Sequence, residues 1–425
     1  MVELRIRGMS VSKESFKIVR DPIHGNIRFD GIFVDLLESP ELQRLHNIKQ
    51  LGFAYMVFPG ANHTRLEHSI GTYHMARRAG DALSLSEEDR ILLECAALLH
   101  DIGHGPFSHT LESILREKFG IDHVDLTERI LKGEECILKD GEGGFVDSKS
   151  VVEILEDNGI DRSRIIDIIR GRCKREKYLS QLLNSPIDVD QLDYLLRDGY
   201  YTGVAYGTID VDRFFHTLTL HDDMLAINKK GISVVENILI SRELMYSSVY
   251  FHKTVRIAEL MLSKAMELVE DVFEFYKLTD WEMLSELKEK GDIQKEIVVR
   301  LKYRRLFKQV YSVPAVDEEK VQTLSYLEDP QKRSEKEKEL EDELDIPRGH
   351  VIIDVPKREL FLSEPRIDKV EIPVLYDEEI VDLMEITPIA RAIKEKKIPD
   401  WYLMVVVDEK CRKKVTDRIE KLILR

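Results

Sequence analysis

Residues 96–109 read AALLHDIGHGPFSH, an apolar run that ends in the adjacent pair His100 and Asp101. His104 and His109 follow, separated by glycine, proline, phenylalanine and serine residues. Because the pair closes a nearly all-apolar segment, folding must bury both groups, and a buried charge requires a partner. A metal ion is a natural partner for a neutral imidazole beside a carboxylate. The stretch therefore predicts a metal centre at the end of a buried helix.

Helices are expected on both sides of this stretch. A helix is expected to open at Ser86, and its residues 91–99 are apolar on almost every side, which is typical of a central buried helix. Residues 106–120 open with proline and close with glycine, the residues that suit the first turn and the end of a helix. On this second helix His109 and Glu112 lie three positions apart and therefore share one face, and His123 follows the closing glycine.

A third helix is expected to begin after Thr64. Thr64 and Glu67 have the spacing of a capping box, in which each side chain bonds to the backbone of the other. His68, Gly71 and Met75 then follow at helical spacing, so that His68 faces the core. A lone histidine on an apolar face is usually a hydrogen-bonded core residue. The metal centre predicted nearby favours a ligand role for His68 instead.

Polar side chains recur every four residues along residues 187–198, at Asp190, Tyr194 and Asp198. This stripe fits a solvated helix face on which Asp198 pairs with a basic residue, and it fits equally well the wall of a pocket. A second polar stripe lies on one face of a long helix that is expected over residues 234–277. Its members are Arg242, Tyr246, Tyr250 and Lys253.

The 425 residues allow one large domain and a smaller one. We expect a mainly α fold, with a helical domain over residues 1–320 whose motifs lie within residues 17–260. A small α+β appendage is expected over residues 321–425, with strands at 351–355 and 401–407.

The net charge of −16 argues against broad binding to nucleic acid or to an anionic membrane, because both require a basic surface. The four cysteines have neither zinc-site nor disulfide-framework spacing. No apolar run approaches the 18 residues of a membrane-spanning helix. We therefore expect a cytoplasmic protein with no membrane partner.

Six separated motifs resemble, in the same order, those of the dNTP triphosphohydrolase group of the HD phosphohydrolase superfamily, which includes animal enzymes with an additional SAM domain. The motifs are residues 43–45, 49–52, 58–61, 65–69, 100–109 and 187–190. The resemblance covers residues 16–260 and implies a helical HD domain. It implies hydrolysis of a dNTP between the 5′ oxygen and the α-phosphate, which releases a deoxynucleoside and intact triphosphate.

The resemblance also implies a set of metal ligands. They are His68, His100, Asp101 and Asp190. Two imidazoles and two carboxylates suit Fe, Mn or Zn better than Mg²⁺ alone and leave positions open for water and a phosphate oxygen. A second ion, Mg²⁺, is expected to accompany the triphosphate.

The active-site histidines of the family fall on His104, His109 and His123, and their acidic partner falls on Glu112. In the expected reaction, water attacks the α-phosphorus. His109, oriented by Glu112, protonates the departing 5′ oxygen, while His104 and His123 hold the α-phosphate. Histidine suits this task because it titrates near neutral pH.

The remaining matches concern substrate binding. Arg65 and Arg242 match residues that hold the phosphate chain, a task that suits the fork-shaped guanidinium. The sugar-pocket matches are Gln50, Leu51, Tyr194, Asp198 and Tyr250. Asp198 and Gln50 are expected to hold the 3′-hydroxyl, and Tyr250 to exclude a 2′-hydroxyl. Gln191 departs from the family, in which a lysine commonly follows the metal-binding aspartate.

We expect a homo-oligomer, dimeric or tetrameric, and a nucleotide activator. Lys17, Glu38 and His46 match activator-site residues of the animal enzyme, with His46 in place of an arginine. Two other functions remain open. One is a different HD phosphatase or phosphodiesterase that acts on nucleotides, and the other is a nucleotide-sensing regulatory protein.

Overall fold

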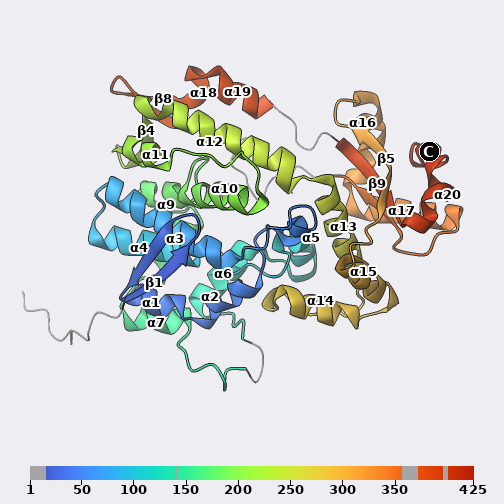
Figure 1. The fold of residues 1–425 in the computed structure, drawn as a ribbon, viewed down its shortest axis with the longest axis horizontal. Helices are drawn as coiled ribbons and strands as arrows, with labels where there is room; N and C mark the ends of the chain where they lie inside the picture. The colour runs from blue at the N-terminus through green and yellow to red at the C-terminus, as the bar shows by residue number, and fades with distance from the viewer. Residues whose placement is uncertain (1–15, 139–141, 357–371, 396–400) are drawn as a thin grey trace, which may run out of the picture.

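The computed structural model describes residues 16–138, 142–356, 372–395 and 401–425. Residues 32–302 are mainly helical (Figure 1), which confirms the predicted mainly α fold with a small α+β part. The helices of this portion are α1 (Ile32–Leu37), α2 (Pro40–Arg44), α3 (Arg65–Ala82), α4 (Glu87–Leu99), α5 (Ser108–Phe119), α6 (His123–Lys132), α7 (Val151–Asp157), α8 (Arg162–Ile169), α9 (Lys177–Leu183), α10 (Val189–Thr202), α11 (Val211–Thr217), α12 (Ile232–Met245), α13 (Lys253–Glu267), α14 (Asp280–Lys288) and α15 (Asp292–Lys302).

Helices α3, α4 and α10 form the centre of this portion. The predicted capping box starts α3: Glu67 Oε2 accepts from the Thr64 N–H at 2.6 Å, and Thr64 Oγ1 accepts from the Glu67 N–H at 3.4 Å. Helix α4 is buried continuously over residues 92–99, as its apolar sequence requires. It packs against α3, which also packs against α10. The residues predicted to bind metal therefore lie on three neighbouring helices or at their ends.

Small sheets surround the helices. β1 (Phe16–Asp21) and β2 (Gly25–Asp30) pair antiparallel. β3 (Leu218–His221) and β4 (Met224–Asn228) form an antiparallel hairpin after α11. β7 (Pro373–Tyr376) pairs parallel to β4, and β8 (Glu379–Asp382) completes this sheet. A chain segment near residue 380 thus joins a hairpin near residue 220.

A third sheet has the order β5-β9-β6, with antiparallel neighbours. Its strands are β5 (Lys308–Pro314), β9 (Trp401–Val407) and β6 (Val351–Asp354), of which β6 and β9 confirm the predicted strands. Side chains alternate between its faces. Met404 and Val406 join the main hydrophobic core, while Leu403, Val405 and Val407 join a smaller cluster. The sheet therefore separates two cores.

The smaller cluster contains side chains from the C-terminal helices. The helices after residue 302 are α16 (Glu318–Leu324), α17 (Pro330–Leu344), α18 (Leu383–Ile386), α19 (Pro388–Glu395), α20 (Arg412–Thr416) and α21 (Ile419–Ile423). In Figure 1, α18 and α19 lie along α12, away from the β5-β9-β6 sheet. The appendage predicted from residue 321 onward thus contributes to two separate sheets, and the boundary itself stays a prediction.

The single helix predicted over residues 234–277 is wrong. Helix α12 continues into a π-helical turn at Tyr246–Tyr250, which ends at Phe251. A separate helix, α13, begins at Lys253. His252 caps α13, because its Nδ1 accepts from the Thr254 N–H at 3.2 Å. Among the helices of the described ranges, none has the length and apolar character needed to span a bilayer.

Candidate metal centre and active site

Three predicted metal ligands, His68, His100 and Asp101, have ligand atoms within 4.8 Å of one another, and the fourth, Asp190, approaches two of them. His68 and Asp190 lie in the first turns of α3 and α10, and His100 and Asp101 follow the last residue of α4. His68 Nε2 lies 3.0 Å from Asp190 Oδ1, and His100 Nε2 lies 3.2 Å from Asp101 Oδ1. A distance of 3.9 Å between His100 Nε2 and Asp190 Oδ1 connects the two pairs. The structure thus brings together all four residues.

The geometry of these residues fits a bound cation. His100 Nδ1 lies 2.8 Å from the carbonyl oxygen of Ala97, which can only accept, so the proton is assigned to Nδ1 and the lone pair to Nε2. That Nε2 is buried and has no hydrogen-bond partner within the described residues. Ligand atoms that share an ion at about 2.1 Å are themselves about 3 Å apart, close to the separations found here. The donor set and its orphaned nitrogen both favour a divalent ion.

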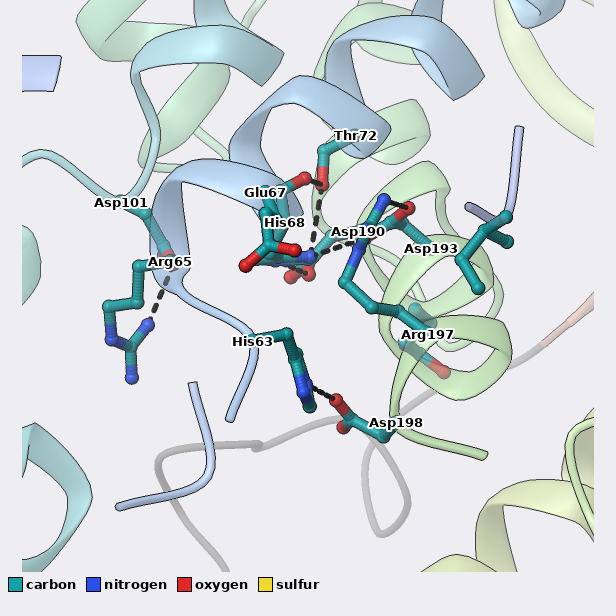
Figure 2. A network of polar contacts seen from close by, with 12 residues as sticks. His63, Arg65, Glu67, His68, Thr72, Asp101, Asp190, Asp193, Arg197 and Asp198 are labelled. Carbon is teal, nitrogen blue, oxygen red and sulfur yellow. Dashed lines mark hydrogen bonds and ion pairs between the residues drawn. The ribbon is translucent and has the colours of Figure 1, made fainter. Parts of the chain in front are cut away.

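Asp193 orients the ring of His68 through a hydrogen bond (Figure 2). Its Oδ2 lies 2.8 Å from His68 Nδ1, on the side of the ring away from Asp190. Arg197 holds the same carboxylate with Nε at 2.8 Å and Nη2 at 2.9 Å. Although burial opposes ionisation, Arg197 and the histidine hydrogen bonds keep the pKa of Asp193 well below its usual range. The sequence analysis missed this residue, although its position three residues after Asp190 puts it near the same helix face.

Arg65 connects the metal centre to the catalytic candidates. Its Nη1 donates to Asp101 Oδ2 at 2.7 Å, and its Nη2 lies 3.1 Å from His109 Nε2. Although burial opposes ionisation, the flanking imidazoles and Arg65 hold the pKa of Asp101 well below its usual range. Desolvation and the guanidinium charge lower the pKa of His109 to about 4. Without a ligand, His109 is therefore neutral near pH 7.

The expectation that Glu112 orients His109 is wrong in this structure. Glu112 Oε1 lies 3.1 Å from His123 Nδ1 and also faces the His123 N–H at 3.4 Å. His123 begins α6, and the turn at Gly120 brings it back beside α5. Its ring stacks on His104, with centroids 4.0 Å apart, and His104 Nε2 lies 3.2 Å from Asp101 Oδ1. Glu112 therefore positions His123.

One pocket contains His109 and all the predicted sugar-binding residues. Those residues are Gln50, Leu51, Tyr194, Asp198 and Tyr250. Asp198 Oδ2 accepts from the Tyr250 hydroxyl at 2.7 Å, and its Oδ1 lies 2.6 Å from His63 Nε2. Gln50 Oε1 is buried with no hydrogen-bond partner within the described residues. The sequence analysis missed His63, which holds Asp198 in place and precedes the capping residue of α3.

Arg242 does not line this pocket. It is buried, donates from Nη1 to Gln191 Oε1 at 3.2 Å, and lies with its guanidinium carbon 5.6 Å from the centre of the Tyr246 ring. Of Arg242, Gln191 and Tyr246, only Tyr246 lines the pocket. Gln191, which replaces the lysine common in the family, thus forms a polar pair with a residue that was expected to hold phosphate.

Two protein-family models match this chain. The model of the HD domain matches residues 65–198, and that of the HD associated region matches residues 209–424. The chain belongs to the HD-domain phosphohydrolase family. An uncharacterized protein of Methanocaldococcus jannaschii is 30% identical over 96% of this chain and 84% of its own length.

Two further relatives carry functional names. The bovine deoxynucleoside triphosphate triphosphohydrolase SAMHD1 is 30% identical over 64% of this chain, which spans 50% of the bovine protein. The crystal structure of a phosphohydrolase from Bacteroides thetaiotaomicron has a TM-score of 0.70 at 26% identity and covers 93% of this chain and 100% of its own. This chain is therefore an HD-domain hydrolase, and its group of histidine and aspartate residues could hold a divalent metal ion.

Proposed function

We propose that this protein is a metal-dependent deoxynucleoside triphosphate triphosphohydrolase. The observation that carries the proposal is a single pocket in which Gln50, Asp198 and Tyr250 face the same space as His109. Through Arg65, His109 is connected to the ligand Asp101. The similarity to a dNTP triphosphohydrolase over 64% of this chain supports the same substrate class.

In this proposal, a metal ion at the candidate centre acts as the electrophile. His68, His100, Asp101 and Asp190 would hold an Fe, Mn or Zn ion, with Mg²⁺ accompanying the nucleotide. A bound ion polarises a phosphate oxygen and lowers the pKa of a bound water. The choice among these metals remains part of the proposal.

The sugar is recognised by the polar side chains of the pocket. Asp198 accepts from Tyr250 and is held by His63, so its carboxylate has a fixed position for the 3′-hydroxyl. Gln50 Oε1 lacks a partner within the described residues and offers a second acceptor there. Tyr250, fixed by the same carboxylate, limits the space beside the sugar and selects against a 2′-hydroxyl.

The histidines bind the α-phosphate and supply a proton to the leaving group. Arg65 places a guanidinium beside His109, where it attracts the phosphate chain. The bound phosphates then raise the pKa of His109, so that it can protonate the departing 5′ oxygen. His104 and His123, stacked together and anchored by Asp101 and Glu112, hold the α-phosphate.

Product analysis tests the proposal. The metal-loaded protein is incubated with each dNTP and rNTP, with and without GTP or dATP as activator, and the products are separated. We expect a deoxynucleoside and intact triphosphate from dNTPs and little turnover of rNTPs. His109→Ala should abolish turnover and retain the metal. Silence with every dNTP, or turnover of monophosphates instead, would reject the proposal.

Assembly and activation belong to the same proposal. Lys17 and Glu38 form an exposed ion pair, and His46 is exposed in a 3₁₀ turn after α2. A homo-oligomer and a nucleotide activator stay predictions. Sedimentation with and without GTP measures both.

A further inference from the structure

The pocket extends beyond the residues used so far. Its wall includes Arg256 and Glu259, which lie three residues apart on α13. Neither residue has a role in the metal centre or in sugar recognition. Both are largely enclosed, with side-chain exposures of 11% for Arg256 and 19% for Glu259. Both residues thus place a charged side chain on the wall of the pocket.

Glu259 has spare hydrogen-bonding capacity. Within the described residues its single hydrogen bond runs from Arg256 Nη1 to Oε2, and this contact is long at 3.5 Å. Its Oε1 accepts no hydrogen bond from any described residue. Burial raises the pKa of the carboxyl group, as expected for a carboxylate that is incompletely solvated. A ligand with hydrogen-bond donors would satisfy it.

Arg256 is held rigidly by the C-terminal sheet. Its Nε donates to Asp354 Oδ2 at 3.3 Å, and its Nη2 donates to Asp354 Oδ1 at 2.9 Å. Asp354 ends β6, is almost fully buried, and also accepts from Trp401 Nε1 of β9 at 3.3 Å. Two corners of the guanidinium are thus occupied. Nη1, the third corner, points to the Glu259 side.

This arrangement offers two acceptor atoms beside one donor. The Watson–Crick edge of guanine presents the complement, because its N1–H and N2–H donate and its O6 accepts. Adenine and cytosine each present one donor on that edge, and thymine presents one donor between two acceptors. Guanine alone among the four bases can engage both oxygens of a carboxylate while accepting from an adjacent guanidinium.

We infer that Glu259 and Arg256 recognise the guanine base, so that dGTP is the preferred substrate. This inference rests on the proposed function and extends it to the base. Glu259 accepts from N1–H and N2–H, and Arg256 Nη1 donates to O6. Asp354 and Trp401 position Arg256, which gives the C-terminal sheet a part in substrate choice.

Deoxyinosine triphosphate provides the matching probe, because its base is guanine without the 2-amino group. We expect kcat/KM for dGTP to exceed that for deoxyinosine triphosphate by about 10–100-fold, the effect of one hydrogen bond to a charged group. Glu259→Gln should bring this ratio close to one. Asp354→Asn, which loosens Arg256, should lower the preference for dGTP over dATP. Glu267→Gln, on the same helix but outside the pocket wall, is the control and should leave both ratios unchanged.

Two results separate this inference from the proposed function. Equal kcat/KM for dGTP and deoxyinosine triphosphate, or a ratio unaffected by Glu259→Gln, overturns base recognition while dNTP turnover upholds the proposed function. If no dNTP is hydrolysed, the proposed function fails. Base recognition is then tested by measuring the equilibrium binding of dGTP and deoxyinosine triphosphate to the wild type and to Glu259→Gln. A Kd ratio that the substitution leaves unchanged then overturns the inference.

Discussion

Asp193 decides which nitrogen of His68 faces the candidate metal centre. Because Asp193 accepts from Nδ1 at 2.8 Å, Nε2 keeps its lone pair on the side of Asp190. The sequence marks Asp193 only by its place in α10. Its partners come from α3, from Arg197 one turn onward, and from His24 beside β2. A role of this kind emerges only when the helices are packed.

Asp193→Asn should lower metal affinity by about 10–100-fold, because an amide can donate to Nδ1 and so favours the wrong tautomer of His68. Metal content after dialysis against a defined concentration of free Mn²⁺ measures the effect. Asp212→Asn, which alters an exposed pair with Arg78, is the matched control. Unchanged metal content in Asp193→Asn would show that His68 needs no hydrogen bond from this carboxylate to bind the metal.

His109 provides a test of the charge balance at the phosphate site. Its pKa is lowered to about 4 by desolvation and by Arg65, so in the free protein its ring should titrate well below pH 6.5. Tripolyphosphate adds negative charge, which favours the protonated ring and moves the midpoint upward. Arg65→Gln should raise it as well. Histidine NMR, assigned with His109→Gln, measures these midpoints, and a value near 6.5 in every state contradicts the argument.

At the scale of elements, Gly71 sets the distance between α3 and α10. A Cβ there would lie 1.8 Å from Asp193 Oδ1 and 2.4 Å from Arg197 Nη2. Gly71→Ala should therefore displace the support of His68, at a cost of about 1–3 kcal/mol in the free energy of unfolding, together with a loss of bound metal. Calorimetric Tm and metal content measure both effects.

Gly80 offers the control on the same helix. A Cβ at Gly80 would lie 3.1 Å from Arg90 Cγ, which belongs to a long side chain that can move. Gly80→Ala should hold Tm level or raise it, because alanine favours a helix over glycine by about 1 kcal/mol. Equal behaviour of the two variants would contradict the proposed role of Gly71.

The sequence allowed the clustering of the candidate metal ligands to be predicted, because such residues are particular types at fixed helical positions, whereas their binding of a metal ion stays a prediction. His68, His100, Asp101 and Asp190 come together as expected. The pairing of Glu112 with His123 could not be predicted, since it depends on the angle between α5 and α6. Helical spacing alone favoured His109 as the partner.

Apolar periodicity also failed at the end of α12. Residues 246–250 keep enough apolar and aromatic character to continue a helical pattern, so the sequence gives no signal for the π-helical turn. The break that follows places Tyr246, Tyr250 and Phe251 on the pocket wall. A local departure from the regular helix thus occurs at the wall of the proposed nucleotide pocket, and such turns are frequent at functional sites.

At the scale of the whole molecule, a buried ion pair joins the helical portion to the C-terminal sheet. Lys264 of α13 donates to Glu337 of α17 at 2.6 Å, and the other carboxylate oxygen of Glu337 accepts from the Ile353 N–H at 2.7 Å. Both side chains are almost fully buried. Lys264 lies about one and a half turns along α13 from Glu259, so the junction and the proposed base site share one helix.

Lys264→Met should destabilise the protein by about 3–5 kcal/mol, because it leaves the Glu337 carboxylate buried without a cation. The loss should be larger at pH 8 than at pH 5, since burial raises the pKa of Glu337 and protonation at the lower pH neutralises the uncompensated group. Adding Glu337→Gln, which keeps an acceptor for Ile353, should restore much of the stability and remove the pH dependence. Urea unfolding at both pH values measures the cycle. A double variant no more stable than Lys264→Met would show that the lysine acts by packing rather than by charge.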